Sequence, residues 1–157
     1  MPYTIELVRT QHGLSVEETL DRLSAGYDPD AELPPLRLTD AQRSAWQRVL
    51  KRVEREIRPV EPEEYLHRLE LWTVGPPGPV QLIYDGDSAT VEVTYRHSGQ
   101  TASAVMEVAY RIARITEEET GLTGHDFEVD QPTRTGDPAR AAARLAGVSD
   151  WAQRNLT

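Results

Sequence analysis

Apolar residues recur at intervals of three and four along residues 101–121, the longest regular pattern in the chain. This spacing places them on one face of an α-helix. Gly121 is suited to end the helix, because glycine readily adopts the left-handed conformation found there. The pattern predicts a long helix that buries one broad side, formed by Val105, Val108, Ala109, Ile112, Ala113, Ile115 and Thr116.

Two shorter amphipathic helices are predicted upstream, each beginning at a capping residue. Ser15 with Glu18, and Thr39 with Gln42, have the spacing of a capping box. Residues 27–38 between the two helices contain three prolines and are predicted to be a linker. The apolar faces consist of Val16, Leu20 and Leu23 in the first helix and of Ala45, Trp46, Val49, Leu50, Val53 and Ile57 in the second.

Five short segments alternate apolar and polar residues, or are rich in β-branched and aromatic ones, and are predicted to be strands. Asp85 and Gly86 join two of them and form a pair favoured in type I′ hairpins, although the loop can extend through Ser88. The predicted strands are residues 3–8, 66–74, 80–84, 89–95 and 125–129.

Together these elements predict an α+β fold in which a mostly antiparallel sheet of four or five strands carries helices on one face. The expected order is β-α-α-β-β-β-α-β plus a C-terminal helix, which begins at Asp137-Pro138 and ends at Gly147. Residues 60–65 and 131–136 are predicted to be an acidic connector and a polar loop. We expect residues 1–131 to form one α+β domain, and residues 132–157 a helical tail that packs on it or extends from it.

The balance of charges disfavours binding to nucleic acid. The chain has 17 basic and 26 acidic residues and a net charge of −9, so its surface should repel phosphate backbones and attract a basic partner. It has no cysteine, which excludes disulfides and thiolate chemistry. Without a long apolar run or a secretory signal pattern, a soluble cytoplasmic protein is expected, with no membrane partner. Because Lys51 is the sole lysine, the composition is typical of a GC-rich coding genome such as an actinobacterial one.

The common catalytic and cofactor motifs are absent. The chain has no phosphate-binding glycine loop, no dinucleotide fingerprint, no nucleophile elbow and no HExxH, so we predict no catalytic residue and no cofactor. One cluster in the sequence has metal-binding chemistry: Glu118, Glu119, His125 and Asp126 supply the oxygen and imidazole ligands that divalent ions use. The simpler interpretation of these residues is a solvated acidic helix end.

Three aromatic residues are candidates for contact with a partner. Trp72 alternates with Leu71 along a predicted strand, so it either packs under a helix or forms an exposed patch, and we favour the core position. Tyr84 and Tyr95 flank the predicted hairpin, where they can pack across the strands or face a partner.

The end of the long helix resembles a motif of small bacterial α+β domains of unassigned function. In those domains a helix ends in Glu-Glu-Thr-Gly-Leu, which residues 118–122 match, and a strand with an aromatic-Asp-Pro-Gln pattern follows. Asp126 fits that strand, whereas the Pro-Gln pair is missing. The resemblance covers residues 69–130 and implies a fold class but no activity.

These observations favour a non-enzymatic protein-binding module that uses an acidic surface. It could be an immunity-like protein, which neutralises a basic toxin, or an adaptor. A small metal-dependent or small-molecule-processing enzyme that uses the carboxylates and histidine of residues 117–130 is the alternative. A homo-oligomer is also compatible with the sequence.

Overall fold

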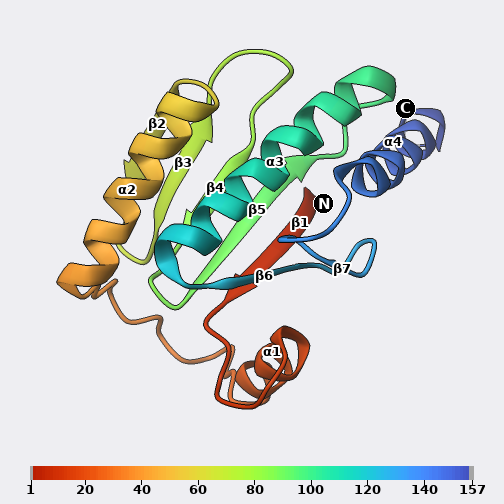
Figure 1. The fold of residues 1–157 in the computed structure, drawn as a ribbon. Helices are drawn as coiled ribbons and strands as arrows, with labels where there is room; N and C mark the ends of the chain where they lie inside the picture. Colours follow the sequence, from red (N-terminus) through yellow and green to blue (C-terminus); the bar gives the residue numbers. More distant parts are fainter. Residues whose placement is uncertain (1, 156–157) are drawn as a thin grey trace.

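In the computed structural model, which describes residues 2–155, seven antiparallel strands form one sheet and four helices pack around it (Figure 1). The elements are β1 (Pro2–Val8), α1 (Val16–Ala25), α2 (Asp40–Glu56), β2 (Val60–Glu64), β3 (Leu69–Thr73), β4 (Gln81–Tyr84), β5 (Ser88–Thr94), α3 (Gly99–Thr120), β6 (Thr123–Asp126), β7 (Gln131–Pro132) and α4 (Pro138–Asn155).

The N-terminal strand β1 lies in the middle of the sheet. The strand order is β2-β3-β4-β5-β1-β6-β7, so β1 pairs with β5 on one side and with β6 on the other. Tyr3, Ile5 and Leu7 of β1 are almost fully buried, and Ile5 lies opposite Val91 of β5. The centre of the sheet therefore depends on pairing between segments far apart in the sequence.

Helix α3 packs along the middle of the sheet and confirms the predicted long helix. Val105 and Ile112 are fully buried, Ile115 is 4% exposed, and Gly121 ends the helix in the left-handed conformation with φ of 76°. Helices α2 and α4 pack against α3 (Figure 1), and α1 contacts β1 and β6. The α+β fold with an antiparallel sheet is as predicted, and α2, α3 and α4 lie on one face of that sheet.

The prediction of four or five strands was too low, because two strands lack the pattern used to identify them. Strand β2 is an edge strand whose residues after Val60 are all exposed, so it has no apolar alternation. Its Pro62 is tolerated because an edge strand leaves some N–H groups unpaired. Strand β7 has only two residues. Strand β6 spans Thr123–Asp126 and not the predicted residues 125–129. It begins earlier because Gly124, not an apolar residue, occupies a buried position beside Leu7, and Phe127 lies beyond its end and is 40% exposed.

Helix α4 continues through Gly147, where the sequence predicted its end. Ala141 and Leu145 are fully buried against the rest of the core, and Ser149 beyond Gly147 is also buried. Gly147 keeps a helical conformation because packing on both sides of it outweighs the weak helix propensity of glycine. The tail packs on the domain. Within residues 2–155, no helix has both the length and the apolar character needed to cross a membrane.

The turns and helix caps agree only in part with those predicted from the sequence. Thr39 and Gln42 form the complete capping box, whereas at Ser15 only the side-chain bond from the Glu18 N–H is present. The β4–β5 hairpin is not type I′, since Gly86 has a positive φ and Asp85 does not. Instead, the Asp85 carboxylate accepts the N–H groups of the two residues after Gly86. Leu23, predicted to face the core, is 52% exposed.

Gly124 is a point at which the packing permits no side chain, which makes it a test of the fold. A Cβ there would contact the Thr133 hydroxyl and lie 3.2 Å from both the Glu117 carboxylate and Leu7. We predict that Gly124→Ala lowers the free energy of unfolding by about 1–3 kcal/mol, the usual cost of overpacking. Urea denaturation of the purified variant measures this.

The matched control is Gly147→Ala in α4, where a Cβ would have no heavy atom within 4 Å. Because alanine favours the helical conformation, this variant should gain about 0.5–1 kcal/mol. If the two substitutions changed the free energy of unfolding equally, the packing described around β6 would be wrong.

Candidate functional site

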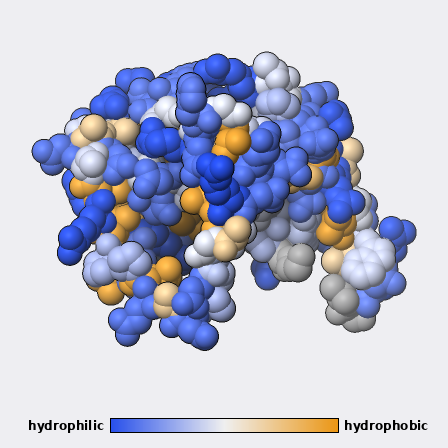
Figure 2. All heavy atoms as spheres, turned by 90° about the horizontal axis from the view of Figure 1, so that it is seen from below, coloured by the Kyte–Doolittle hydropathy of each residue, from blue (hydrophilic) through white to orange (hydrophobic). Residues whose placement is uncertain are grey.

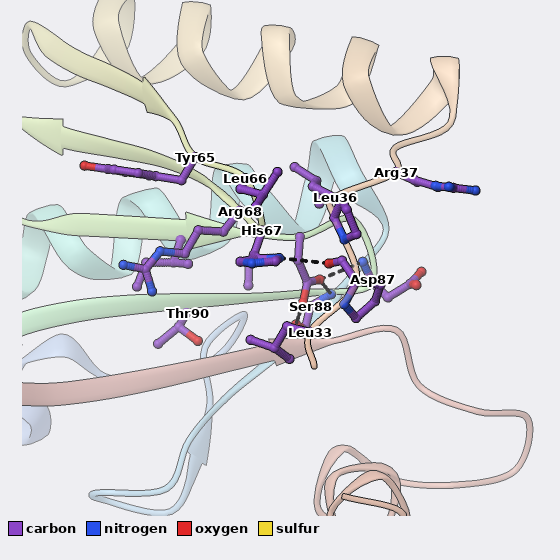
Figure 3. A pocket seen from close by; sticks show the side chains of 15 residues that line it. Leu33, Leu36, Arg37, Tyr65, Leu66, His67, Arg68, Asp87, Ser88 and Thr90 are labelled. Atoms are coloured by element: carbon purple, nitrogen blue, oxygen red, sulfur yellow. Dashed lines mark hydrogen bonds between the residues drawn. The ribbon is translucent and has the colours of Figure 1, made fainter. Parts of the chain in front are cut away.

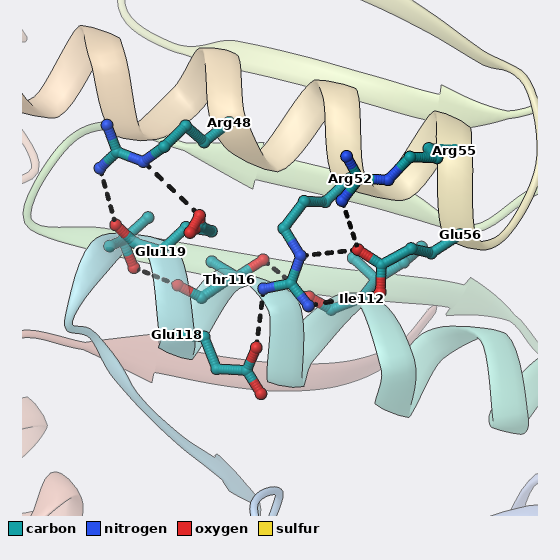
Figure 4. Close-up of polar contacts among 9 residues, drawn as sticks. Arg48, Arg52, Arg55, Glu56, Ile112, Thr116, Glu118 and Glu119 are labelled. Carbon is teal, nitrogen blue, oxygen red and sulfur yellow. Dashed lines mark hydrogen bonds and ion pairs between the residues drawn. The ribbon is translucent and has the colours of Figure 1, made fainter.

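Glu118 and Glu119, at the end of α3, form ion pairs with α2 (Figure 4). The Arg52 guanidinium lies 2.7 Å from the Glu118 carboxylate, and the Arg48 Nε lies 3.5 Å from that of Glu119. Arg52 also pairs with Glu56 on its own helix at 2.7 Å. These arginines offset the unfavourable position of carboxylates at a helix C-terminus, and they link α2 to α3.

His125 and Asp126 lie in two other environments. The His125 Nε2 lies 2.9 Å from a carboxylate oxygen of Asp130, and its ring packs against Phe127. Asp126 is fully buried and accepts hydrogen bonds from the hydroxyls of Tyr3 and Tyr110. The structure therefore does not bring the four sequence candidates together. Within residues 2–155, no group of three or more His, Asp or Glu side chains is placed to hold a metal ion.

Asp126 instead joins three elements of the core. Tyr3 of β1 donates at 2.6 Å, Tyr110 donates from α3, and the N–H of Glu128 donates at 3.0 Å. Gln131 donates to the Tyr110 hydroxyl at 2.7 Å. Burial, and then the hydrogen bond to Asp126, raise the pKa of both Tyr3 and Tyr110, so both hydroxyls keep their protons. The cluster is structural.

We predict that Asp126→Ala is strongly destabilising, because it leaves two buried tyrosine hydroxyls without their acceptor. The expected loss is about 2–4 kcal/mol of unfolding free energy, measured by urea denaturation. Asp130→Ala removes an exposed carboxylate from the same region and should cost less than about 1 kcal/mol. A loss at Asp126 no larger than that at Asp130 would show that the hydroxyls find other partners.

Of the three candidate aromatic residues, Trp72 alone is exposed by more than a third, at 37%. Tyr84 is 1% exposed and stacks on Trp46 of α2, with ring centroids 5.4 Å apart. Tyr95 is half-buried and donates to Glu128 at 3.0 Å. Tyr84 lies opposite Ala89, so the two tyrosines do not meet across the hairpin. Trp72, for which we favoured a core position, lies on the side of the sheet opposite Leu71 and α3.

Helices α2, α3 and α4 lie on the other side of the sheet (Figure 1), and we call the side that carries Trp72 the open face. Residues directly opposite one another in antiparallel strands point to the same side, so the register defines its members. Two cross-strand rows form its centre: Glu61, Trp72, Gln81, Glu92 and Thr4, and beside them Glu63, Glu70, Ile83, Thr90, Glu6 and His125.

Five glutamates therefore share the open face, and three of them lack a compensating group. Glu70 is 2% exposed, accepts a hydrogen bond from Gln81 and lies 3.5 Å from Arg68. Burial, and then the proximity of Glu92, raise the pKa of Glu6, while a hydrogen bond from Thr90 lowers it. Within residues 2–155, no side chain forms an ion pair or hydrogen bond with the carboxylates of Glu61, Glu63 and Glu92.

A cavity of about 890 Å³ lies at one end of the open face (Figure 3). The linker supplies Leu33 and Leu36 to its wall, the β2–β3 turn supplies Leu66, and β4 supplies Ile83. The linker is fixed there by the hydrogen bond from the Leu36 N–H to the Leu66 carbonyl at 2.8 Å.

Figure 2 shows the molecule from below the view of Figure 1. The surface on this side is mostly hydrophilic, with hydrophobic side chains exposed in small separate patches.

A second cavity, of about 480 Å³, has Trp72 in its wall. Glu61, Glu63 and Tyr65 line it from β2 and the following turn, and residues 74, 75 and 79 line it from the β3–β4 loop. Tyr65 borders both cavities. An aromatic ring, two uncompensated carboxylates and a concave surface therefore occur together at this point.

The β3–β4 loop beside this cavity rests on a buried histidine. His97 is 7% exposed and lies directly under Gly78, where a Cβ would be only 2.7 Å from the ring. Its Nε2 has no hydrogen-bond partner within residues 2–155, and burial lowers the pKa of His97. Arg58 donates to the carbonyls of Gly75 and Pro76 in the same loop. The loop is therefore held by a neutral imidazole and a charged guanidinium.

We predict that acid destabilises the protein through His97. Because its pKa is lower in the folded than in the unfolded chain, the unfolded chain binds the proton first as the pH falls below about 6.5. The stabilisation is complete above that pH and is lost as the pH falls towards the folded pKa, by at most about 1.4 kcal/mol per pH unit. Urea denaturation from about pH 7.5 to about pH 5 measures the slope.

His97→Gln should make this pH dependence shallower, whereas His12→Gln, at an exposed histidine, should leave it unchanged. Identical slopes in the wild type and both variants would contradict the assignment to His97.

Sequence reasoning missed the open face, because its members become neighbours only through strand register. Glu61 lies in β2, which the sequence did not predict, and Glu6 and Glu92 are paired neighbours of Thr90 and Thr4 although they lie far apart in the sequence. The alternation of glutamates at positions 61 and 63 was the sequence signal that could have indicated a strand with an acidic side.

Comparisons with protein-family models, with curated proteins and with solved structures give no match to this chain.

Proposed function

We propose that this chain is a protein-binding module whose open face receives a basic surface of a partner protein. One observation carries the proposal: Glu61, Glu63 and Glu92 lie on the open face around the exposed Trp72, and no side chain of residues 2–155 forms an ion pair or hydrogen bond with their carboxylates. At the end of α3, by comparison, the carboxylates of Glu118 and Glu119 are paired with the chain's own arginines.

The electrostatics of the open face favour a cationic partner. Glutamates on one sheet face repel one another, and cationic groups brought by a partner would relieve this repulsion. An excess of one charge also raises the rate of association with an oppositely charged surface. Tryptophan is among the residues that contribute most to binding when a partner covers them. The net charge of −9 also favours a basic partner.

Two kinds of protein-binding module fit this surface. An immunity-like protein would cover and neutralise a basic toxin, and an adaptor would hold a basic protein for another component. Both would act without catalysis. By contrast, no observation favours the metal-dependent enzyme, because Glu118, Glu119, His125 and Asp126 are engaged in separate contacts.

The test compares two pairs of charge-neutralising substitutions in binding to a partner recovered from a lysate of the source organism. Glu6→Gln with Glu92→Gln removes two charges from the open face, and we predict that it weakens binding about tenfold. Glu17→Gln with Glu54→Gln removes two charges from exposed positions on α1 and α2 and should leave the affinity unchanged. Calorimetric titration with the purified partner, at low and high salt, measures the affinity of each double variant.

The proposal also predicts that the partner is basic and that added salt weakens its binding. An acidic partner, or equal weakening by the two pairs of substitutions, would exclude the open face as the binding surface.

A further inference from the structure

We propose that the cavity lined by Trp72 binds an arginine side chain of the partner, with the guanidinium against the indole and its N–H groups directed to Glu61 and Glu63. This inference rests on the proposed function and specifies the chemistry of one part of the open face. It commits to a basic protein segment as the occupant, and charge complementarity is the argument for that choice.

The register of β2 and β3 places the two carboxylates beside the ring. Glu61 lies directly opposite Trp72, and Glu63 lies opposite Glu70, one step along the same side of the sheet. Both glutamates line the same cavity as the indole. A cation over the indole would thus have two carboxylates on one flank, which suits the several donors of a guanidinium.

The chain already binds one of its own guanidinium groups in this way on the adjacent part of the open face. The Arg68 guanidinium lies 5.7 Å from the centre of the Tyr65 ring and 3.5 Å from the Glu70 carboxylate. In Figure 3 the side chains of Tyr65 and Arg68 extend in the same direction from the β2–β3 turn. Trp72 with Glu61 and Glu63 offers the same combination of ring and carboxylate, with no guanidinium from within residues 2–155.

Arginine fits this combination better than the other cationic side chain. Its planar guanidinium stacks on an aromatic ring and donates hydrogen bonds to a carboxylate at the same time, whereas the lysine ammonium is a compact, strongly hydrated charge. Tryptophan is the aromatic residue that attracts cations most strongly. The ring and the carboxylates together therefore select an arginine.

The far wall of the cavity is held in place before any ligand arrives. The Val74 N–H donates to the Pro59 carbonyl at 3.0 Å, and the Val80 N–H donates to the Thr73 hydroxyl at 2.9 Å. With Arg58 bound to the loop carbonyls, the segment after Trp72 is fixed from both ends. Little ordering is needed on binding, which favours affinity.

The experiment titrates the ¹⁵N-labelled full chain with the capped peptide Gly-Arg-Gly and follows the indole N–H signals of its three tryptophans, the Trp72 signal being identified with Trp72→Phe. We expect a saturable shift at Trp72 that is absent at Trp46 and Trp151. The peptide with lysine should bind more weakly, and the peptide with citrulline, which has the same shape but no charge, should not bind.

Glu61→Gln with Glu63→Gln should weaken the arginine peptide about tenfold, while Glu17→Gln with Glu54→Gln should leave it unchanged. No saturable shift at Trp72, an equal shift with citrulline, or no effect of the Glu61 and Glu63 substitutions would each overturn the arginine site.

Failure of this site and failure of the proposed function are distinguishable. If the peptide does not bind but Glu6→Gln with Glu92→Gln still weakens the partner, the arginine site is wrong and the open face remains the binding surface. If the peptide binds as expected but neither open-face pair affects the partner, the arginine site stands and the proposed function is wrong.

Discussion

The burial of α3 against the middle of the sheet is the contact on which the rest of the structure depends. Its apolar side covers β5, β1 and β6, and α2 and α4 pack against its flanks. Val105 and Ile112 have no exposed surface, and they belong to the main hydrophobic core, which lies on this side of the sheet. The other side is then free to carry polar and charged residues, and this freedom makes an acidic open face compatible with folding.

Several carboxylates of the chain have internal partners, and those around Trp72 have none in the part of the chain that the structure describes. On the helical side, Glu118 and Glu119 are paired with arginines, and the buried Asp126 receives tyrosine hydroxyls. On the open side, Glu61 and Glu63 have no such partners within residues 2–155, although Glu70 close by does. Exposed carboxylates need no internal partner for folding, but their grouping beside Trp72 on one face of the sheet favours a cationic surface. This grouping is the physical basis of the proposed function.

Features encoded locally could be predicted from the sequence, and features that depend on distant pairing could not. The face of α3 and the cap at Thr39 follow from spacings of three or four residues, and the structure has both. Strand β2 was not predicted, because an exposed edge strand requires no apolar alternation. The burial of Asp126 could not be foreseen, since its donor Tyr3 is 123 residues away. For the same reason the candidate site could not be assembled before the register was known.

The most direct test of the account is the hydrogen-exchange footprint of the purified partner on the full chain. Binding to the open face predicts slower amide exchange in β2, β3 and their connecting turn, with the exposed sides of α2 and α4 unchanged. Protection confined to α2 or α4, with β2 and β3 exchanging as in the free protein, would contradict it.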